Sequence, residues 1–195
     1  MKIKICGIKY YKDLSTCINL GVDYIGINFY NQSKRYAENG DILNHLDVLK
    51  EPEKAKLIAV FHNHNIYDIT NILEKYPYFQ SMQINNSIQN SDIQASSKKY
   101  NIWLVCQNVI DLLDNNEDVE LKLIDNSLGS GKEIDVEIPE RIRCKFGIAG
   151  GINESNITKI KDKYPNSYVI DIASGVENKG VFSEQKLANI LKLLW

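Results

Sequence analysis

The sequence KIKICGI, residues 2–8, has the form of a short, mostly apolar strand that ends in a thiol. Isoleucines alternate with lysines, Cys6 stands at the C-terminal end, and Gly7 follows at once. Because glycine lets the backbone turn sharply, the sulfur can be left facing a cavity. An isolated cysteine is more often a small buried apolar residue, so the role of Cys6 depends on what else the fold brings to that strand end.

The composition is that of an ordinary globular protein. Hydrophobic residues make up 44% and charged residues 25% of the 195 residues, and the net charge is −2. This charge balance gives no sign of a nucleic-acid partner. No apolar run approaches the roughly 20 residues that span a bilayer, and the N-terminus is too quickly polar for a signal peptide. We therefore expect a cytoplasmic protein without a membrane or nucleic-acid partner.

The cysteines and histidines indicate no metal site. The four cysteines lie far apart and form no CxxC pattern, which predicts reduced thiols: Cys6, Cys17, Cys106 and Cys144. His62 and His64 would share one face of a strand, but no third ligand is near them in the sequence. We expect no metal ion and no organic cofactor.

Eight short apolar runs recur along the chain: residues 2–6, 24–29, 57–61, 79–84, 102–106, 121–125, 146–149 and 168–172. Their alternation with helical patterns predicts parallel strand–helix–strand units. Eight units without a central change of pattern favour a closed (β/α)8 barrel, a TIM barrel, over a doubly wound open sheet. We expect one α/β domain over residues 1–195, small for a fold that typically has ~250 residues.

The helical segments have recognisable ends. Asn65, Asn153 and Ser183 are predicted N-caps, and Gly21 is a predicted C-cap. The expected helices follow residue 10, lie between residues 40 and 50, and cover residues 65–76 and 88–99, with a short turn at 109–116 and further helices after residues 153 and 183.

In such a barrel the C-terminal ends of the strands form one rim, and active sites lie there. The rule selects Cys6, Arg35, Asn85, Asp125 and two glycine turns, at residues 150–151 and 174–175. Glycine turns after the last two strands expose backbone N–H groups that suit a phosphate. A thiol and a carboxylate at one barrel mouth suit proton transfer, one as base and the other as acid, and Arg35 can pair with a ligand carboxylate.

Taken together, several segments resemble the phosphoribosylanthranilate isomerase family over nearly the whole chain. They occur in that family's order and at its spacing: KICGI (4–8), GVDYIGINFY (21–30), SKR (33–35), AVF.N (59–63), LKLIDNSLGSGKEID (121–135), AGGINESNI (149–157) and VIDIASGVENKG (169–180). The resemblance is far more specific than any single motif. It implies a barrel enzyme of tryptophan biosynthesis that needs no cofactor.

The resemblance also implies a reaction and roles for individual residues. N-(5-phosphoribosyl)anthranilate would be isomerised to 1-(2-carboxyphenylamino)-1-deoxy-D-ribulose 5-phosphate, with Asp125 as general acid and Cys6 as general base. Arg35 would hold the anthranilate carboxylate. The implied phosphate-binding residues are Gly150, Gly151, Ser174 and Gly175, with Asp171 beside them as a further substrate-binding residue.

The chain departs from the family pattern at two places. Asn85 stands where the family has a histidine, and it retains the ability to hydrogen-bond the substrate. Asn31 and Lys34 stand where the family has two prolines, which predicts a less rigid loop before Arg35.

Two alternative functions remain open. The first is a phosphoribosyl sugar isomerase of the histidine-pathway type, although such enzymes have an aspartate where this chain has Cys6. The second is a non-catalytic barrel that binds a phosphorylated ligand, whose mark would be the loss of Cys6 or Asp125. We expect a small phosphorylated sugar–anthranilate substrate, and a monomer in preference to a homodimer.

Overall fold

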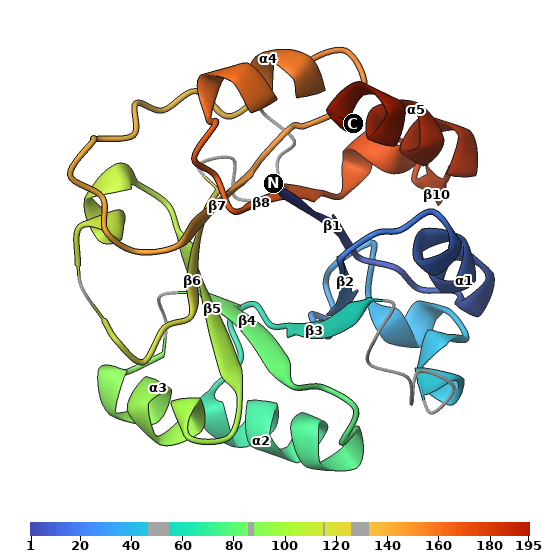
Figure 1. Ribbon diagram of the computed structural model, residues 1–195. Helices are drawn as coiled ribbons and strands as arrows, with labels where there is room; N and C mark the ends of the chain where they lie inside the picture. Colours follow the sequence, from blue (N-terminus) through green and yellow to red (C-terminus); the bar gives the residue numbers. More distant parts are fainter. Residues whose placement is uncertain (47–54, 86–87, 115, 126–132) are drawn as a thin grey trace.

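The computed structural model describes residues 1–46, 55–85, 88–114, 116–125 and 133–195, with only the backbone of residue 85. Eight parallel strands form a closed barrel in which β1 pairs with both β2 and β8 (Figure 1). The strands are β1 (Lys2–Cys6), β2 (Tyr24–Asn28), β3 (Lys56–Val60), β4 (Ser81–Asn85), β5 (Asn101–Cys106), β6 (Leu121–Ile124), β7 (Phe146–Ala149) and β8 (Val169–Ile172). The predicted (β/α)8 barrel is confirmed.

Five α-helices surround the barrel in the part of the chain that the structure describes (Figure 1). They are α1 (Tyr11–Asn19), α2 (Ile66–Lys75), α3 (Asn90–Ser97), α4 (Ile157–Lys163) and α5 (Glu184–Leu194). Short 3-10 turns lie elsewhere, η1 (Ala37–Asn39), η2 (Ile42–Asn44), η4 (Val109–Leu112) and η5 (Ser174–Val176), and β9 (Glu177–Asn178) pairs with β10 (Val181–Phe182). Between β5 and β6, the described residues contain the short turn η4 in place of a full helix, which reduces the number of residues that the barrel needs.

The helix predicted between residues 40 and 50 is wrong over the residues described. Residues 42–44 form a single 3-10 turn, and residues 47–54 lie outside the described residues. Tertiary hydrogen bonds hold this segment against the loop after β1, because Asp41 Oδ1 accepts the N–H of Tyr11 and the Ile42 N–H donates to Lys9 O. A Cβ on Gly40 would lie 2.2 Å from Lys9 O, so glycine permits this close approach.

The predicted helix ends are mostly confirmed. Asn65 Oδ1 accepts the N–H of Asp68, and Ser183 Oγ accepts the N–H of Lys186, so both residues cap their helices. Gly21 follows α1 with φ +80°, a conformation that favours glycine. Asn153 does not cap α4. The N-cap is Asn156, and the Asn153 side chain accepts the N–H of Ser155 in the turn before it.

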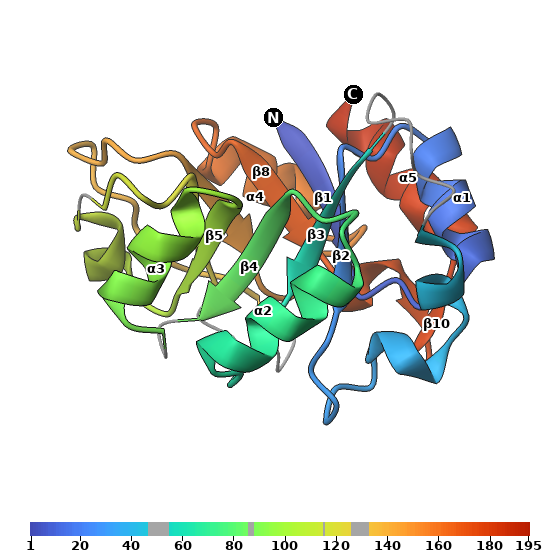
Figure 2. The same ribbon diagram turned by 90° about the horizontal axis from the view of Figure 1, so that it is seen from below.

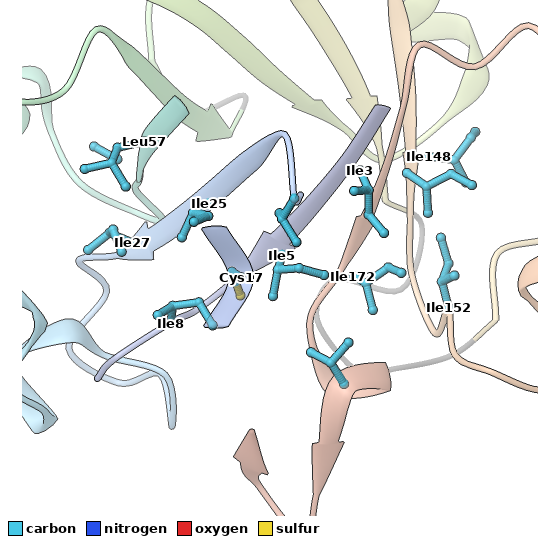
Figure 3. Close-up of a cluster of buried hydrophobic side chains, with 14 of the residues drawn as sticks. Ile3, Ile5, Ile8, Cys17, Ile25, Ile27, Leu57, Ile148, Ile152 and Ile172 are labelled. Carbon is cyan, nitrogen blue, oxygen red and sulfur yellow. The ribbon is translucent and has the colours of Figure 1, made fainter. Parts of the chain in front are cut away.

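Two apolar cores lie on either side of the strands. Between strands and helices, isoleucines of the barrel pack against buried residues of the helices, and Figure 3 shows Ile3, Ile5, Ile25 and Cys17 within this outer core. The inner core fills the barrel and contains Tyr24, Ile58, Val60, Trp103, Leu121, Leu123, Ala149 and Val169. Alternation along each strand separates the two sets, since successive side chains point to opposite faces.

The inner core stops short of one end of the barrel. Both termini lie at the other end, and the strand arrows point away from them (Figure 2). Towards the C-terminal ends of the strands, the inward-facing residues become polar or charged, with Lys4, Gln83 and Asp171 all buried. Gln83 and Asp171 of this layer line a cavity at that end.

Candidate active site

A cavity of about 550 Å³ opens at the C-terminal ends of the strands. This volume lies within the usual range for a small-molecule site. All eight strands or the loops that follow them contribute, through residues that include Cys6, Asn28, Phe61, Gln83, Gln107, Asp125, Gly150 and Asp171. A hollow of about 560 Å³ lies at the other end of the barrel, beside Lys2 and Tyr168, and contains none of the predicted rim residues.

Cys6 is placed as the sequence predicts, at the end of β1 and on the cavity wall. Gly7 has φ +87° and donates its N–H to Gly26 O at 2.8 Å, which turns the chain away from the sulfur. Gly26 on β2 is also needed, because a Cβ there would lie 2.9 Å from Cys6 Sγ and 3.2 Å from Lys4 Nζ. Because Gly26 has no side chain, Cys6 Sγ and Lys4 Nζ can both lie next to its Cα.

The resting sulfur is a thiol. Burial raises the pKa of Cys6, the nearby Lys4 ammonium lowers it, Asp171 raises it and Arg35 lowers it, and the net result is a pKa above the ordinary value. Cys6 can accept a proton only as a thiolate, and the positive charges around it favour that form.

Lys4 and Asp171 form an ion pair inside the barrel. Lys4 Nζ donates to Asp171 Oδ2 at 2.7 Å, and the two side chains are 0% and 7% exposed. Burial disfavours the ammonium, but Asp171 and Cys6 together raise the pKa of Lys4 above its ordinary value, so it remains charged. Asp171 was predicted near the site from the sequence, but Lys4 was not, because its only signal is a charge inside a mostly apolar strand.

Arg35 lies on the cavity wall, and one edge of its guanidinium is bound by Glu177. Its Nε and Nη2 donate to the two carboxylate oxygens of Glu177 at 2.6 and 2.8 Å. The hydrogen bond with Glu177 raises the pKa of Arg35. The arginine stem crosses Gly7, where a Cβ would lie 2.3 Å from Arg35 Cδ. Glu177 was not predicted from the sequence and lies on β9, after the last barrel strand.

The loop before Arg35 is fixed by side-chain hydrogen bonds. Ser33 Oγ accepts the backbone N–H of Arg35 at 3.1 Å and the side-chain amide of Asn28 at 3.2 Å. Asn28 Oδ1 in turn accepts the N–H of Tyr30 at 2.8 Å. These local bonds restrain the loop that lacks the family's two prolines, and serine and asparagine commonly form them.

Asp125 follows β6 directly and lines the same cavity as Cys6. Its N–H donates to Cys106 O at 2.9 Å, which continues the pairing of β6 with β5. Burial and, more weakly, the charge of Asp125 raise the pKa of Asp171, whereas Lys4 lowers it. Asp125 therefore acts electrostatically across the mouth of the barrel. The side chain of Asn85, at the end of β4, lies outside the described residues.

The carbonyl groups of the first glycine turn are bound by neighbouring donors. Gly150 and Gly151 have φ +109° and +59° and line the cavity. Gly150 O accepts the N–H of Ile134, and Gly151 O accepts the side-chain amides of Asn153 and Asn156. Because C=O and N–H point in opposite directions across a trans peptide, these bonds turn the N–H groups of Gly151 and Ile152 the other way.

The second turn contributes differently. Ser174 lines the cavity, whereas Gly175 is buried in η5 behind it. A Cβ on Gly175 would lie 2.0 Å from Ile152 O, so this glycine lets the two turns pack against each other. The structure thus brings Gly150, Gly151 and Ser174 to the cavity and places Gly175 in a supporting position.

We expect Gly175→Ala to lower the stability of the fold. The new methyl group must displace backbone at Ile152, and overpacking of this kind costs about 1–3 kcal/mol. Urea unfolding measures the loss. Ser174→Ala, at the neighbouring position without this contact, is the matched control and should unfold like the native chain. Equal stability of Gly175→Ala and the native chain would contradict the packing role.

Two buried polar atoms at this cavity have no hydrogen-bond partner among the residues that the structure describes. They are Gln83 Oε1 and Asp171 Oδ1, on residues that are 8% and 7% exposed. Buried polar groups are nearly always paired, so both atoms point to a ligand with hydroxyl or amine donors. Gln83 was not predicted from the sequence, although a glutamine inside an apolar run is a usable signal.

The described residues contain no cluster of three His, Cys, Asp or Glu side chains that would hold a metal ion. His64 Nδ1 lies 3.0 Å from His62 O, so the pair is engaged locally. Among the helices that the structure describes, none is long and apolar enough to cross a membrane.

Comparison with known proteins gives one consistent result. A model of the family described as N-(5'phosphoribosyl)anthranilate (PRA) isomerase matches residues 3–193. The chain is 28% identical over 198 residues to the N-(5'-phosphoribosyl)anthranilate isomerase of Sulfurovum sp. (strain NBC37-1), covering 98% of this chain and 97% of that protein. It is 27% identical to the protein of the same name from Staphylococcus aureus (strain MRSA252), covering 100% and 97%.

Solved structures show the same fold. Phosphoribosyl anthranilate isomerase from Thermus thermophilus superposes with a TM-score of 0.82 at 22% identity, over 100% of this chain and 98% of that chain. A second such isomerase, in complex with reduced 1-(o-carboxyphenylamino)-1-deoxyribulose 5-phosphate, gives a TM-score of 0.77 at 21% identity, over 98% and 97%.

Proposed function

The chain belongs to the N-(5'-phosphoribosyl)anthranilate isomerase family, and we propose that Cys6 and Asp125 carry out that family's isomerisation in it. The family and fold predicted from the sequence are confirmed. One observation carries the proposed roles: a single cavity brings together a thiol, a carboxylate, an arginine and a glycine turn, from the first, sixth, second and seventh strands or the loops after them. Each is a group that the reaction requires.

Asp125 is the general acid. It donates a proton to the furanose ring oxygen of N-(5'-phosphoribosyl)anthranilate, which opens the ring and leaves a Schiff base between C1 and the anthranilate nitrogen. A carboxyl group suits this step because it transfers a proton to an oxygen that develops negative charge. Its position at the end of β6 places it on the rim where barrel enzymes carry out catalysis.

Cys6 is the general base. Its thiolate takes the proton from C2 of the Schiff base, and the resulting enolamine tautomerises to the ketone of the product. The Schiff base makes the C2 proton acidic, so a thiolate is a strong enough base. Gly7 and Gly26 leave the sulfur accessible from the cavity.

Arg35 holds the anthranilate carboxylate. Glu177 uses the Nε–H and one N–H of Nη2, and a guanidinium has five N–H groups in total. The edge formed by Nη1 and Nη2 therefore remains for a second, bidentate carboxylate. Phe61 and the edge-to-face pair of Tyr30 and His62, with ring centroids 4.9 Å apart, supply aromatic surface beside it for the benzoate ring.

The phosphate of the substrate binds at the glycine turns. The N–H groups of Gly151 and Ile152 and the hydroxyl of Ser174 are donors suited to a phosphate. The unpartnered oxygens of Gln83 and Asp171 accept hydrogen bonds from the sugar hydroxyls between the two charged ends. Asn85 stays a predicted substrate contact.

We expect Glu177→Gln to raise KM about tenfold while kcat changes little. The substitution keeps the shape of the side chain but removes one charge-assisted bond that aims Arg35, and such a bond contributes about 1.5–3 kcal/mol. Steady-state kinetics measures both constants. Glu120→Gln breaks an exposed pair with Lys145 outside the cavity and should leave both constants unchanged. A native KM in Glu177→Gln would contradict this role for the Arg35–Glu177 pair.

Turnover of N-(5'-phosphoribosyl)anthranilate tests the function directly. The substrate is generated in the cuvette, and its fluorescence is lost as it is isomerised. The native chain should remove the signal catalytically without added metal or cofactor. The proposed activity would be overturned if the folded chain bound the product analogue, reduced 1-(o-carboxyphenylamino)-1-deoxyribulose 5-phosphate, and still showed no turnover.

We further propose that residues 1–195 act as a single-domain cytoplasmic monomer. The four cysteines are free thiols, as is usual in a reducing compartment. Light scattering at micromolar concentration tests the monomer, and cell fractionation tests the compartment. A stable dimer or an exported protein would contradict the respective expectation.

A further inference from the structure

We propose that Lys4 is a positioning residue of the reaction: its buried ammonium, held by Asp171, is a fixed positive charge beside Cys6 that stabilises the thiolate. The inference rests on the proposed function only in giving Cys6 the role of base. Its main consequence, control of the ionisation of Cys6 by Lys4, is measurable without substrate.

The geometry of the β1, β2 and β8 strands carries the proposal. Lys4 and Cys6 are two residues apart on β1, so both point into the barrel. Their Nζ and Sγ atoms lie 3.2 and 2.9 Å from one point, the position that a Cβ of Gly26 would occupy. Asp171 pairs in register with Lys4 across β1 and β8 and holds the ammonium at 2.7 Å. The charge is therefore both close to the sulfur and fixed in place.

The surroundings make this charge effective. Lys4 is completely buried, and apolar residues of the inner core pack against Cys6. A charge interaction that is small in water becomes several times larger where solvent is excluded. The buried Lys4–Asp171 pair is also expensive for the fold, because both charges lose their water, and replacing such a pair as a whole by hydrophobic residues is often neutral or stabilising. A role in the reaction, and not in stability, accounts for a lysine at this buried position.

Other charged groups also face this region, and they do not replace Lys4. Beside Lys4, the groups are Asp171 of β8, Arg35 after β2 and Asp125 after β6. Burial raises the pKa of Cys6, and of the charges that act on the sulfur directly, Lys4 lowers it more than Arg35 does. Arg35 is also committed to Glu177. On β2, Tyr24 bonds to Tyr168 instead.

Alkylation of Cys6 by iodoacetamide as a function of pH tests the proposal, because only the thiolate reacts. Mass spectrometry of the peptide that contains Cys6 separates it from the other thiols in the intact, folded chain. In Lys4→Met the midpoint of reactivity should move to higher pH. At a fixed pH below the midpoint, alkylation should slow about tenfold for each unit of that shift.

Lys122→Met is the matched control. Lys122 is the other fully buried lysine of the described chain, and its ammonium donates to Asp111 O and Asp114 O beside η4. Its loss removes the same charge from a buried site away from Cys6, so the midpoint for Cys6 should not change.

Lys4→Met leaves the Asp171 carboxylate buried without its partner, which lowers the stability of the fold. A second pair of variants tests the proposal if Lys4→Met does not fold. Asp171→Asn should move the midpoint to lower pH, because it removes a negative charge near the sulfur. Adding Lys4→Met to Asp171→Asn gives a neutral pair and should move the midpoint back up. Equal midpoints of Asp171→Asn with and without Lys4→Met would overturn the proposal.

Turnover separates this role from a merely structural one. The loss of kcat/KM in Lys4→Met should be largest at neutral pH and should shrink as pH rises and the thiolate forms. A uniform loss at every pH would contradict the charge role. If the native chain shows no turnover, the proposed function fails, and the alkylation midpoints still decide the role of Lys4.

Discussion

Cys6→Ser is expected to remove turnover almost completely while the barrel stays folded. General bases typically accelerate proton transfer about 100- to 10,000-fold, and a loss of that size is expected here. A serine hydroxyl ionises far less readily than a thiol, so it cannot take the C2 proton near neutral pH. Measurement of kcat with N-(5'-phosphoribosyl)anthranilate gives the loss directly.

The change should affect chemistry and leave binding intact. Sulfur and oxygen differ little in size, and Cys6 stands at the edge of the inner core, so stability should be close to native. Affinity for the reduced product analogue should also be retained. Cys144→Ser is the matched control, because its thiol donates to Leu112 O at 3.3 Å and a serine can make the same bond. Native turnover in Cys6→Ser would show that Cys6 is not the general base.

Asp125→Asn is expected to have an effect of similar size on kcat. The amide keeps the shape of the carboxyl group but has no proton to give to the ring oxygen, so ring opening loses its acid. Pre-steady-state measurement should show that the substrate still binds and that its fluorescence no longer decays. Because Asp125 lies at the rim after β6, its loss should leave the barrel intact.

The control for this variant lies at the other end of the barrel. Asp23 accepts hydrogen bonds from Lys2 Nζ and from the N–H of Ile3, before β2 begins. Asp23→Asn makes the same chemical change far from the cavity and should retain native turnover. Equal kcat values for Asp125→Asn and Asp23→Asn would exclude Asp125 as the acid.

Much of the fold was predictable because it depends on local patterns. Eight apolar runs that alternate with helical periodicity specify parallel units, and a strand buried on both faces leaves a clear apolar run. Helix caps such as Asn65 and Ser183 are read from three or four neighbouring residues. The segment at residues 40–46 was mispredicted because its conformation depends on bonds from Tyr11 and to Lys9, which lie about thirty residues earlier.

The candidate site shows the same division. Cys6, Asp125, Arg35 and the turn at Gly150 could be predicted to lie at one cavity because each stands at or after the end of a strand, and strand ends share one rim. Glu177 and Gln83 were missed. A glutamate in a short loop and a glutamine in a strand have many ordinary explanations until their neighbours are known.

The sequence by itself determined the barrel, the family and the residue types at its rim, because periodicity and motif spacing are properties of neighbouring residues. Only the tertiary structure decided which charges act together. Lys4 meets Asp171 across 167 positions of chain, and Arg35 meets Glu177 across 142. Both contacts form because β1 closes the barrel against β8, and pairings at such separations leave no periodic trace in the sequence.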